Sequence, residues 1–219
     1  MQSAPPRFHW TTFDVASQLE TGWQRSIAVA AAGADFREFL RTPVLSRESA
    51  EVRCIARGRV YADRVRRALP WLYRSYRGYF RELARAACGE AIEPARDDRY
   101  GLVLNVQRGR AMRFECHVDS NPVTGLLFCT DHGAGAGGEL VFAHRPDAAG
   151  IASVDRDCAV IRPQAGHLIF FDGRYHPHYV RPLRSGAATR IVAVMNFYTE
   201  SSPESARPPE LNRHLFGDR

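Results

Sequence analysis

The sequence predicts a mainly β domain, a jelly roll of two sheets with a buttress of helices that come first in the chain. Up to about residue 100 the apolar residues mostly recur at helical spacing, and from about residue 101 short strands alternate with turn residues. The 219 residues, 45% of them hydrophobic, suit one domain. We therefore expect a mostly helical part over 1–100, a jelly-roll core over 101–198 and a C-terminal tail over 199–219.

The clearest helical segment covers residues 61–90, where apolar residues recur every three or four positions. These apolar positions are Val65, Leu69, Leu72, Tyr76, Phe80, Leu83 and Ala87. Pro70 is expected either to kink this helix or to start a second one, and Gly89 is a plausible stop. The apolar stripe must pack on another surface, and the strands that follow offer one.

Eight short strands are predicted after residue 101, separated by Gly, Pro, Asp and Asn. They cover residues 102–107, 112–119, 123–130, 138–143, 158–163, 167–172, 176–182 and 190–198. The tail after them is rich in Pro and Ser, and we expect it either to wrap the surface or to be loosely held.

The composition argues against two classes of partner. The formal net charge is +6, but all 30 basic residues are Arg and they are scattered along the chain, so we expect a solvated surface and no nucleic acid. No apolar run approaches about 18 residues, so no membrane-spanning helix is expected. A small-molecule partner is the preferred interpretation, and the sequence carries no signal for an oligomeric state.

The sequence also predicts a cytoplasmic protein. Its first residues lack a basic region followed by an apolar stretch, so no secretory signal is expected. The five cysteines are odd in number and form no C-x-x-C pair, which is typical of reduced thiols in a cytoplasm.

His117 and Asp119 are the first candidate metal ligands. On a strand, residues two apart face the same side, so the imidazole and the carboxylate could occupy neighbouring positions around one metal ion. The alternative is a surface histidine beside a turn-capping aspartate, because the sequence D-S-N-P at 119–122 favours a turn.

A second candidate group lies further along the chain. His178 begins an H-x-V-x-P stretch, and Arg190 lies 12 residues further on, across a Gly-containing turn. Two histidines and one carboxylate on one face of a metal leave three positions open, which is typical of non-haem Fe(II) oxygenases. A buried Arg190 would require a carboxylate partner, and its planar fork suits one. His176 is the rival to His178, since both lie on one face of a regular strand.

Taken together, these motifs resemble a known family. In chain order they are H-x-D at 117–119, G-G-E at 137–139, P-x-x-G at 163–166, H-x-V-x-P at 178–182 and then a basic residue. This order is similar to that of the Fe(II)/2-oxoglutarate-dependent oxygenases, most closely their prolyl-4-hydroxylase-like branch, over residues 101–198. The resemblance implies a double-stranded β-helix, which is a cupin-like jelly roll, and the use of Fe(II), 2-oxoglutarate and O2.

The resemblance implies roles for individual residues. His117, Asp119 and His178 would bind Fe(II). 2-Oxoglutarate would chelate the iron, with its far carboxylate on Arg190. Gln107 stands where relatives often have a Tyr that hydrogen-bonds the cosubstrate.

Other positions depart from the family or lie beside its site. Asn105 would lie on the same face as Gln107 and is a further cosubstrate candidate. Val192 stands where a Ser or Thr is frequent, so one contact to the cosubstrate carboxylate is missing or supplied elsewhere.

The implied reaction is hydroxylation of an unactivated C–H bond, with release of succinate and CO2. The intact Asp119 disfavours halogenation, since halogenating relatives usually have Gly or Ala there. Arg110, Arg113 and His176 are candidate substrate contacts, and a small anionic or amino-acid-like molecule is the preferred substrate. The alternatives are a peptide or protein side chain, or a cupin-like isomerase or binding module with no oxygenase activity.

Overall fold

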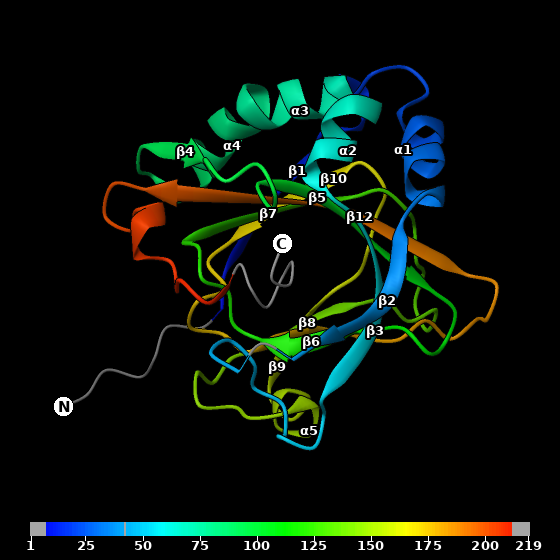
Figure 1. Cartoon of the computed structure of the whole chain (residues 1–219), viewed down its shortest axis with the longest axis vertical. Coiled ribbons are helices and arrows are strands. Elements are labelled where there is room, and N and C mark those ends of the chain that lie inside the picture. The colour runs from blue at the N-terminus through cyan, green and yellow to red at the C-terminus, as the bar shows by residue number, and fades with distance from the viewer. Residues whose placement is uncertain (1–7, 42, 212–219) are drawn as a thin grey trace.

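The computed structural model describes residues 8–41 and 43–211, which form two facing sheets (Figure 1). The larger sheet has the order β1 (Trp10–Asp14), β10 (His167–Phe171), β7 (Val123–Phe128), β12 (Thr189–Thr199), β5 (Leu102–Arg108), β3 (Cys54–Val60) and β2 (Asp35–Leu40), with β4 (Ile92–Pro94) paired to β12. The smaller sheet has the order β6 (Phe114–His117), β11 (His178–Val180), β8 (Leu140–Ala143) and β9 (Cys158–Ile161). All the strand pairs are antiparallel, so the predicted jelly roll is confirmed.

The helices gather on one side of the larger sheet. Figure 1 shows α1 (Trp23–Ala32), α2 (Ala62–Ala68), α3 (Pro70–Arg77) and α4 (Tyr79–Cys88) on the outer face of that sheet, and α5 (Ile151–Val154) beside the smaller sheet. Two short 3-10 helices cover Ala16–Gln18 and Glu204–Ala206. As expected, Pro70 begins a new helix, and Gly89 ends α4 with a left-handed φ of 76°. Gly78 separates α3 from α4, a break that the helical periodicity concealed.

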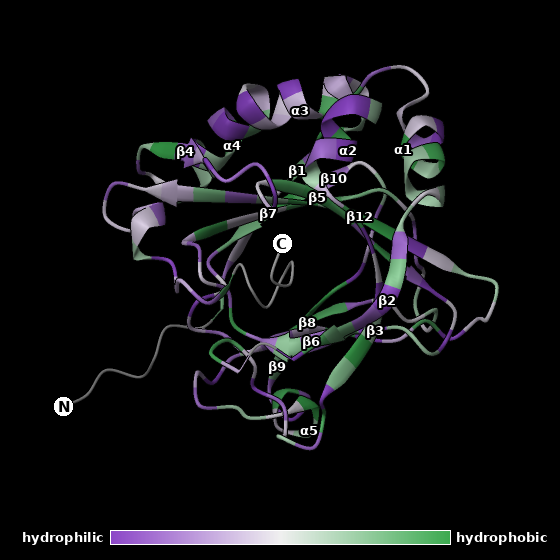
Figure 2. Cartoon of the chain, viewed as in Figure 1, coloured by the Kyte–Doolittle hydropathy of each residue, from purple (hydrophilic) through white to green (hydrophobic). Residues whose placement is uncertain are grey.

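The two largest hydrophobic clusters among the described residues follow from this layering. One lies between the helices and the larger sheet and contains Leu72 and Phe80 together with Leu104 of β5. The other lies between the two sheets and contains Phe128, Phe142 and Val192. In Figure 2 the strands beneath the helices are mostly hydrophobic, while α2 to α4 carry hydrophilic stretches. The sheet therefore buries both faces, one under helices and one around an internal cavity.

The eight strands predicted after residue 101 all overlap observed strands. The prediction of a mostly helical part over 1–100 was wrong in one respect, because β1, β2, β3 and β4 lie there between the helices. The sequence pattern does not predict these strands because their apolar and polar residues do not alternate. β1 and β2 are largely exposed, and the inward face of β3 carries arginines.

The described part of the C-terminal tail packs on the domain. The Glu204 carboxylate accepts hydrogen bonds from the backbone N–H groups of Arg96 (2.6 Å) and Asp97 (3.1 Å) and from the Tyr100 hydroxyl (2.6 Å). Leu211 is buried. The tail thus wraps the surface as far as residue 211, and the rest of the predicted tail lies outside the described residues.

Within the described ranges, no helix combines the length and apolar character needed to cross a membrane. All five cysteines are free thiols, and Cys116 and Cys129 are buried.

Candidate metal and cosubstrate site

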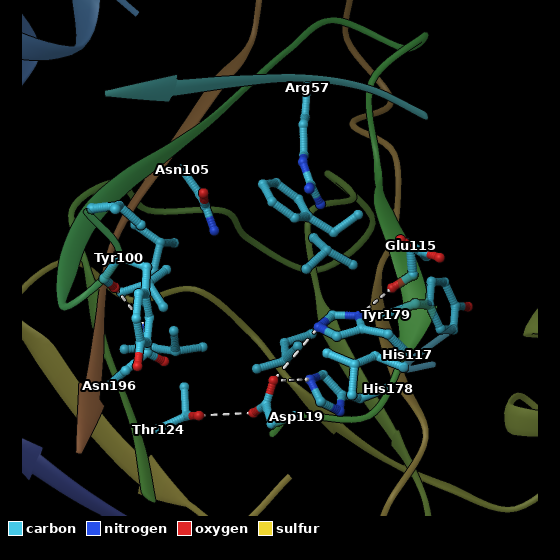
Figure 3. Close-up of a pocket in the computed structure, with 18 of the residues that line it drawn as sticks. Arg57, Tyr100, Asn105, Glu115, His117, Asp119, Thr124, His178, Tyr179 and Asn196 are labelled. Carbon is cyan, nitrogen blue, oxygen red and sulfur yellow. Dashed lines mark hydrogen bonds and ion pairs between the residues drawn. The ribbon is translucent and has the colours of Figure 1, made fainter. Parts of the chain in front are cut away.

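Three side chains converge at the smaller sheet: His117 at the end of β6, Asp119 two residues later, and His178 at the start of β11. The two strands pair with His178 directly opposite His117. One ligand atom from each residue lies within 4.8 Å of the other two. The Oδ1 atom of Asp119 is 3.6 Å from Nε2 of His117 and 3.7 Å from Nε2 of His178 (Figure 3). These distances fit one metal ion bound on one face by all three.

Both imidazole rings are held with the same nitrogen facing the carboxylate. Nδ1 of His117 lies 2.6 Å from the carbonyl oxygen of Glu115, and Nδ1 of His178 lies 2.9 Å from the carbonyl oxygen of His176. When Nδ1 carries the proton and donates it there, the lone pair of each Nε2 points toward Asp119. The backbone therefore fixes the tautomer that a metal requires.

Hydrogen bonds also fix the orientation of the Asp119 carboxylate. Thr124 donates a hydrogen bond to its Oδ2 atom (2.7 Å), and Asn121 donates to the Thr124 hydroxyl (2.9 Å), which leaves Oδ1 for a metal. Gly173 packs against this group, because a Cβ atom there would lie 2.4 Å from Oδ2 of Asp119. Sequence reasoning missed Thr124 and Gly173, since neither belongs to the H-x-D motif.

The electrostatics of this group favour metal binding. Burial alone would raise the pKa of Asp119, but the adjacent His178 and His117 rings lower it to about 2. Burial lowers the pKa of His178 to about 4, so its ring stays neutral near neutral pH. Burial also acts to lower the pKa of His117, yet contact with Asp119 outweighs it and raises that pKa. Of the three ligands, only His117 has a pKa shifted toward keeping its proton, so metal binding displaces a proton chiefly from His117.

This assignment predicts a pH dependence for metal binding. Because the pKa of His117 is raised and a metal displaces its proton, Mn(II) affinity should fall about tenfold for each pH unit below that pKa and level off above it. Calorimetric titration at a pH below that pKa, in two buffers of different ionisation enthalpy, should find close to one proton released per metal. Release of two protons would show that His178 is also protonated and would contradict the assignment.

Arg190 lies within the domain on β12, 2% exposed, behind the three candidate ligands. Its Nε and Nη2 atoms have no hydrogen-bond partner among the described residues, although the side chain lines the same cavity as His117 and Asp119. Burial lowers the pKa of Arg190 to about 9, so the guanidinium remains charged near neutral pH. A buried cation without a partner is costly, and a carboxylate would satisfy its fork.

The family comparison agrees with this geometry. Residues 102–198 match the family model described as the 2OG-Fe(II) oxygenase superfamily. The matched part of the chain is a domain of this superfamily. It is therefore a non-haem oxygenase that uses Fe(II), 2-oxoglutarate and O2, as the resemblance implied. The match favours an enzyme that uses 2-oxoglutarate over the alternative of a binding module without oxygenase activity.

Several solved structures share the fold of this oxygenase. AviO1 from Streptomyces viridochromogenes Tue57 has a TM-score of 0.64 and 16% identity, over 92% of this chain and 94% of that chain. The epimerase SnoN in complex with Fe3+, α-ketoglutarate and nogalamycin RO has a TM-score of 0.61 and 12% identity, over 88% and 80%. A Trichoplax adhaerens prolyl hydroxylase, in complex with a hypoxia inducible factor peptide fragment, has a TM-score of 0.58 and 14% identity, over 88% and 84%. The shared fold is the predicted double-stranded β-helix, and no curated protein matches the chain in sequence.

The G-G-E motif of the oxygenase shapes the space around Arg190. Gly137 and Gly138 both have a left-handed φ, near 80°. A Cβ atom on Gly138 would lie 3.1 Å from Cδ of Arg190, and one on Gly137 would lie 2.2 Å from the carbonyl oxygen of Pro182. The two glycines thus allow the backbone before β8 to pass close to Arg190 and to the strand that follows His178.

Gly137→Ala should therefore destabilise the oxygenase by at least about 2 kcal/mol, because it adds a backbone clash to an unfavourable φ. Gly133→Ala in the same loop is the matched control, since its Cβ atom would meet nothing within 4 Å. The control should change the free energy of unfolding by no more than about 0.5 kcal/mol. Urea unfolding measures both, and equal effects would contradict the close approach.

The two further cosubstrate candidates differ in their position. Asn105 lines the cavity, and its Oδ1 atom has no partner among the described residues. Gln107 lies opposite Arg190 across β5 and β12 but is not among the cavity-lining residues. Its amide nitrogen donates to the carbonyl oxygens of Met112 and Arg181, both at 2.9 Å. Gln107 thus donates its amide protons to backbone carbonyls while its Oε1 atom has no partner among the described residues, and its role toward the cosubstrate stays a prediction.

None of the three predicted substrate contacts is among the residues that line the cavity, and their role toward a substrate stays a prediction. Arg110 is exposed and donates to the carbonyl oxygen of Arg184 (2.7 Å). Arg113 forms a bidentate ion pair with Glu48, which holds the segment before β3 against β6. His176 is buried with Nδ1 3.0 Å from the carbonyl oxygen of Ala143, which resolves its rivalry with His178.

Other polar side chains do line the cavity. Arg57 and Arg59 project into it from β3, and Glu115 does so from β6. Sequence reasoning missed all three. The spacing R-G-R in β3 was the available signal, since residues two apart on a strand share a face.

Proposed function

We propose that this oxygenase hydroxylates an unactivated C–H bond of a small molecule, with release of succinate and CO2. The observation that carries the proposal is one cavity lined by a metal-binding face and by a buried guanidinium without a partner. The metal-binding face has the ligands that bind Fe(II), and the guanidinium can bind a carboxylate of the cosubstrate.

The site residues fall into two groups, one that would bind the metal and one that would bind the cosubstrate. His117, Asp119 and His178 would hold Fe(II) on one face and leave the opposite positions open. Arg190 would bind the far carboxylate of 2-oxoglutarate through its two unpartnered nitrogen atoms. When bound, iron and cosubstrate supply the oxidising chemistry, while the protein positions the C–H bond and excludes water.

The proposed reaction balances as follows. One oxygen atom of O2 enters succinate as 2-oxoglutarate loses CO2, and the other becomes the hydroxyl oxygen of the product. Asp119 supports hydroxylation over halogenation, because its carboxylate occupies the coordination position that a halide would need.

Two segments that border the cavity support a small substrate over a peptide. Ser46 pairs with His117 as a β-bridge, which places the segment before β3 beside the metal face. Leu45 from this segment and Leu211 from the tail both line the cavity. We expect these two bordering segments to leave less room for a peptide than for a small molecule.

The proposal is tested by anaerobic titration with Fe(II) and 2-oxoglutarate, followed by a screen for compounds that stimulate succinate formation. Under 18O2, a small-molecule substrate should gain one labelled oxygen atom, and succinate should gain the other. Stimulation by peptides alone would favour the peptide alternative. A product with no added oxygen would indicate desaturation, cyclisation or epimerisation instead.

A further inference from the structure

Two arginines on β3 have no assigned task in the proposed reaction. Arg57 and Arg59 lie two residues apart, so both side chains leave the same face of the strand and enter the cavity. Each is only 7% exposed. The Nε atom of each lacks a hydrogen-bond partner among the described residues, and Glu115 is the carboxylate whose charge acts on Arg57. Such groups are normally paired when buried.

Aromatic rings hold the two guanidinium groups in place. The Cζ atom of Arg57 lies 4.5 Å from the ring centre of Phe39 and 5.4 Å from that of Phe114, and Cζ of Arg59 lies 5.4 Å from that of Phe39. These contacts orient the planar groups and supply part of the attraction that burial removes. They leave the N–H groups free to donate to a ligand.

The two groups face the reaction centre. Phe114 is on β6, three residues before His117, so the contact with Arg57 brings β3 beside the metal face. Figure 3 shows the Arg57 side chain directed into the cavity toward His117 and Asp119, with Asn105 beside it. A ligand held here would lie between β3 and the open side of the candidate metal site.

The charges in the cavity leave room for an anion. Its described lining holds three guanidinium groups, on Arg57, Arg59 and Arg190, against two carboxylates, on Glu115 and Asp119. Asp119 faces the metal, and Arg190 suits one end of 2-oxoglutarate. Burial lowers the pKa of Arg57 to about 10 and that of Arg59 to about 9, so both remain charged at neutral pH. Glu115 is the remaining acid in the cavity, and its charge partly offsets the effect of burial on Arg57, so one positive charge of the pair is left for an anion.

We propose that Arg57 and Arg59 bind an oxyanion on the primary substrate, a carboxylate or a phosphate, and thereby place the substrate's C–H bond at the metal face. This rests on the proposed function for its catalytic meaning, but the oxyanion site itself does not depend on turnover. Asn105, opposite Arg59 across β3 and β5, offers an unpartnered acceptor for a hydroxyl or amino group of the same molecule. The substrate is thus a small acid with hydrogen-bond donors.

The test uses the full chain loaded with Mn(II) and 2-oxoglutarate, titrated by calorimetry with acetate and, separately, with inorganic phosphate. One of the two probes should bind with one site per chain. Arg57→Gln and Arg59→Gln should each weaken that binding by about tenfold to a hundredfold. Arg108→Gln is the matched control, since Arg108 is exposed on the adjacent strand β5 and stacks on Phe36, away from the cavity.

The outcomes separate the alternatives. Preference for acetate or for phosphate identifies the oxyanion. The oxyanion site is overturned if both probes bind equally well to wild type and to the double variant Arg57→Gln/Arg59→Gln. It is also overturned if these variants lose 2-oxoglutarate affinity, because the pair would then be the cosubstrate anchor. Oxyanion binding without succinate formation from any compound would instead count against the proposed function alone.

A turnover assay gives a second readout once a substrate acid is known. Arg59→Gln should raise KM for the acid by at least about tenfold and change KM for its uncharged primary amide little. Equal effects on both compounds would show that Arg59 supports only the shape of the cavity.

Discussion

Asp119→Ala should abolish 2-oxoglutarate turnover and leave the domain folded. The substitution removes the only carboxylate of the described metal-binding group, and two neutral imidazoles bind Fe(II) weakly by comparison. The Asp119 side chain accepts a hydrogen bond from Thr124 and contacts the rings of His117 and His178, so its loss should lower the free energy of unfolding without unfolding the domain. Succinate formation, Mn(II) titration and circular dichroism measure the three effects.

His178→Ala and His176→Ala form a matched pair that tests the same centre. Both residues lie on the short stretch that leads into β11, but only the ring of His178 reaches Asp119. His178→Ala should abolish turnover, whereas His176→Ala should keep Fe(II) affinity and lose stability, because its buried ring packs beside Phe8. Full activity of His178→Ala with an inactive His176→Ala would show that the distal ligand is wrongly assigned.

Arg190→Leu should raise the 2-oxoglutarate requirement steeply and leave Fe(II) affinity nearly unchanged. A two-point, charge-assisted contact contributes about 1.5–3 kcal/mol per hydrogen bond, so the expected loss is tenfold to about a hundredfold or more. Arg190→Lys should be partly tolerated, although one ammonium cannot reproduce the planar fork. Calorimetric titration of the Mn(II)-loaded protein with 2-oxoglutarate measures both variants.

The effect of Arg190→Leu on the free energy of unfolding serves as a control for its effect on cosubstrate binding. Without cosubstrate, Arg190→Leu should raise the free energy of unfolding by about 1 kcal/mol or more, because the wild-type guanidinium is buried without a partner. Added 2-oxoglutarate should stabilise the wild type but not the variant. Unchanged cosubstrate affinity in a folded Arg190→Leu would remove Arg190 from the cosubstrate site.

The sequence alone determined the strands of the jelly roll after residue 101 and the candidate metal ligands. These features are local: a strand has a period of two, and H-x-D places two ligands on one face of one segment. The spacing of Arg190 after His178 is local as well, because a single turn separates the two residues in the sequence. The strands before residue 101 lacked this local signal, since β1 and β2 are largely exposed and the inward positions of β3 carry arginine in place of apolar residues.

Only the tertiary structure decided which polar groups meet. It showed that Gln107 spends its amide protons on backbone carbonyls and that Arg113 is paired with Glu48, which no spacing reveals. It also brought Arg57 and Arg59, about 60 residues before the metal motif, into the same cavity through the pairing of β3 with β5. The physical reason is that hydrogen-bond and charge partners of a buried polar group come from strands distant in sequence, so pairing and burial decide which groups remain for a ligand.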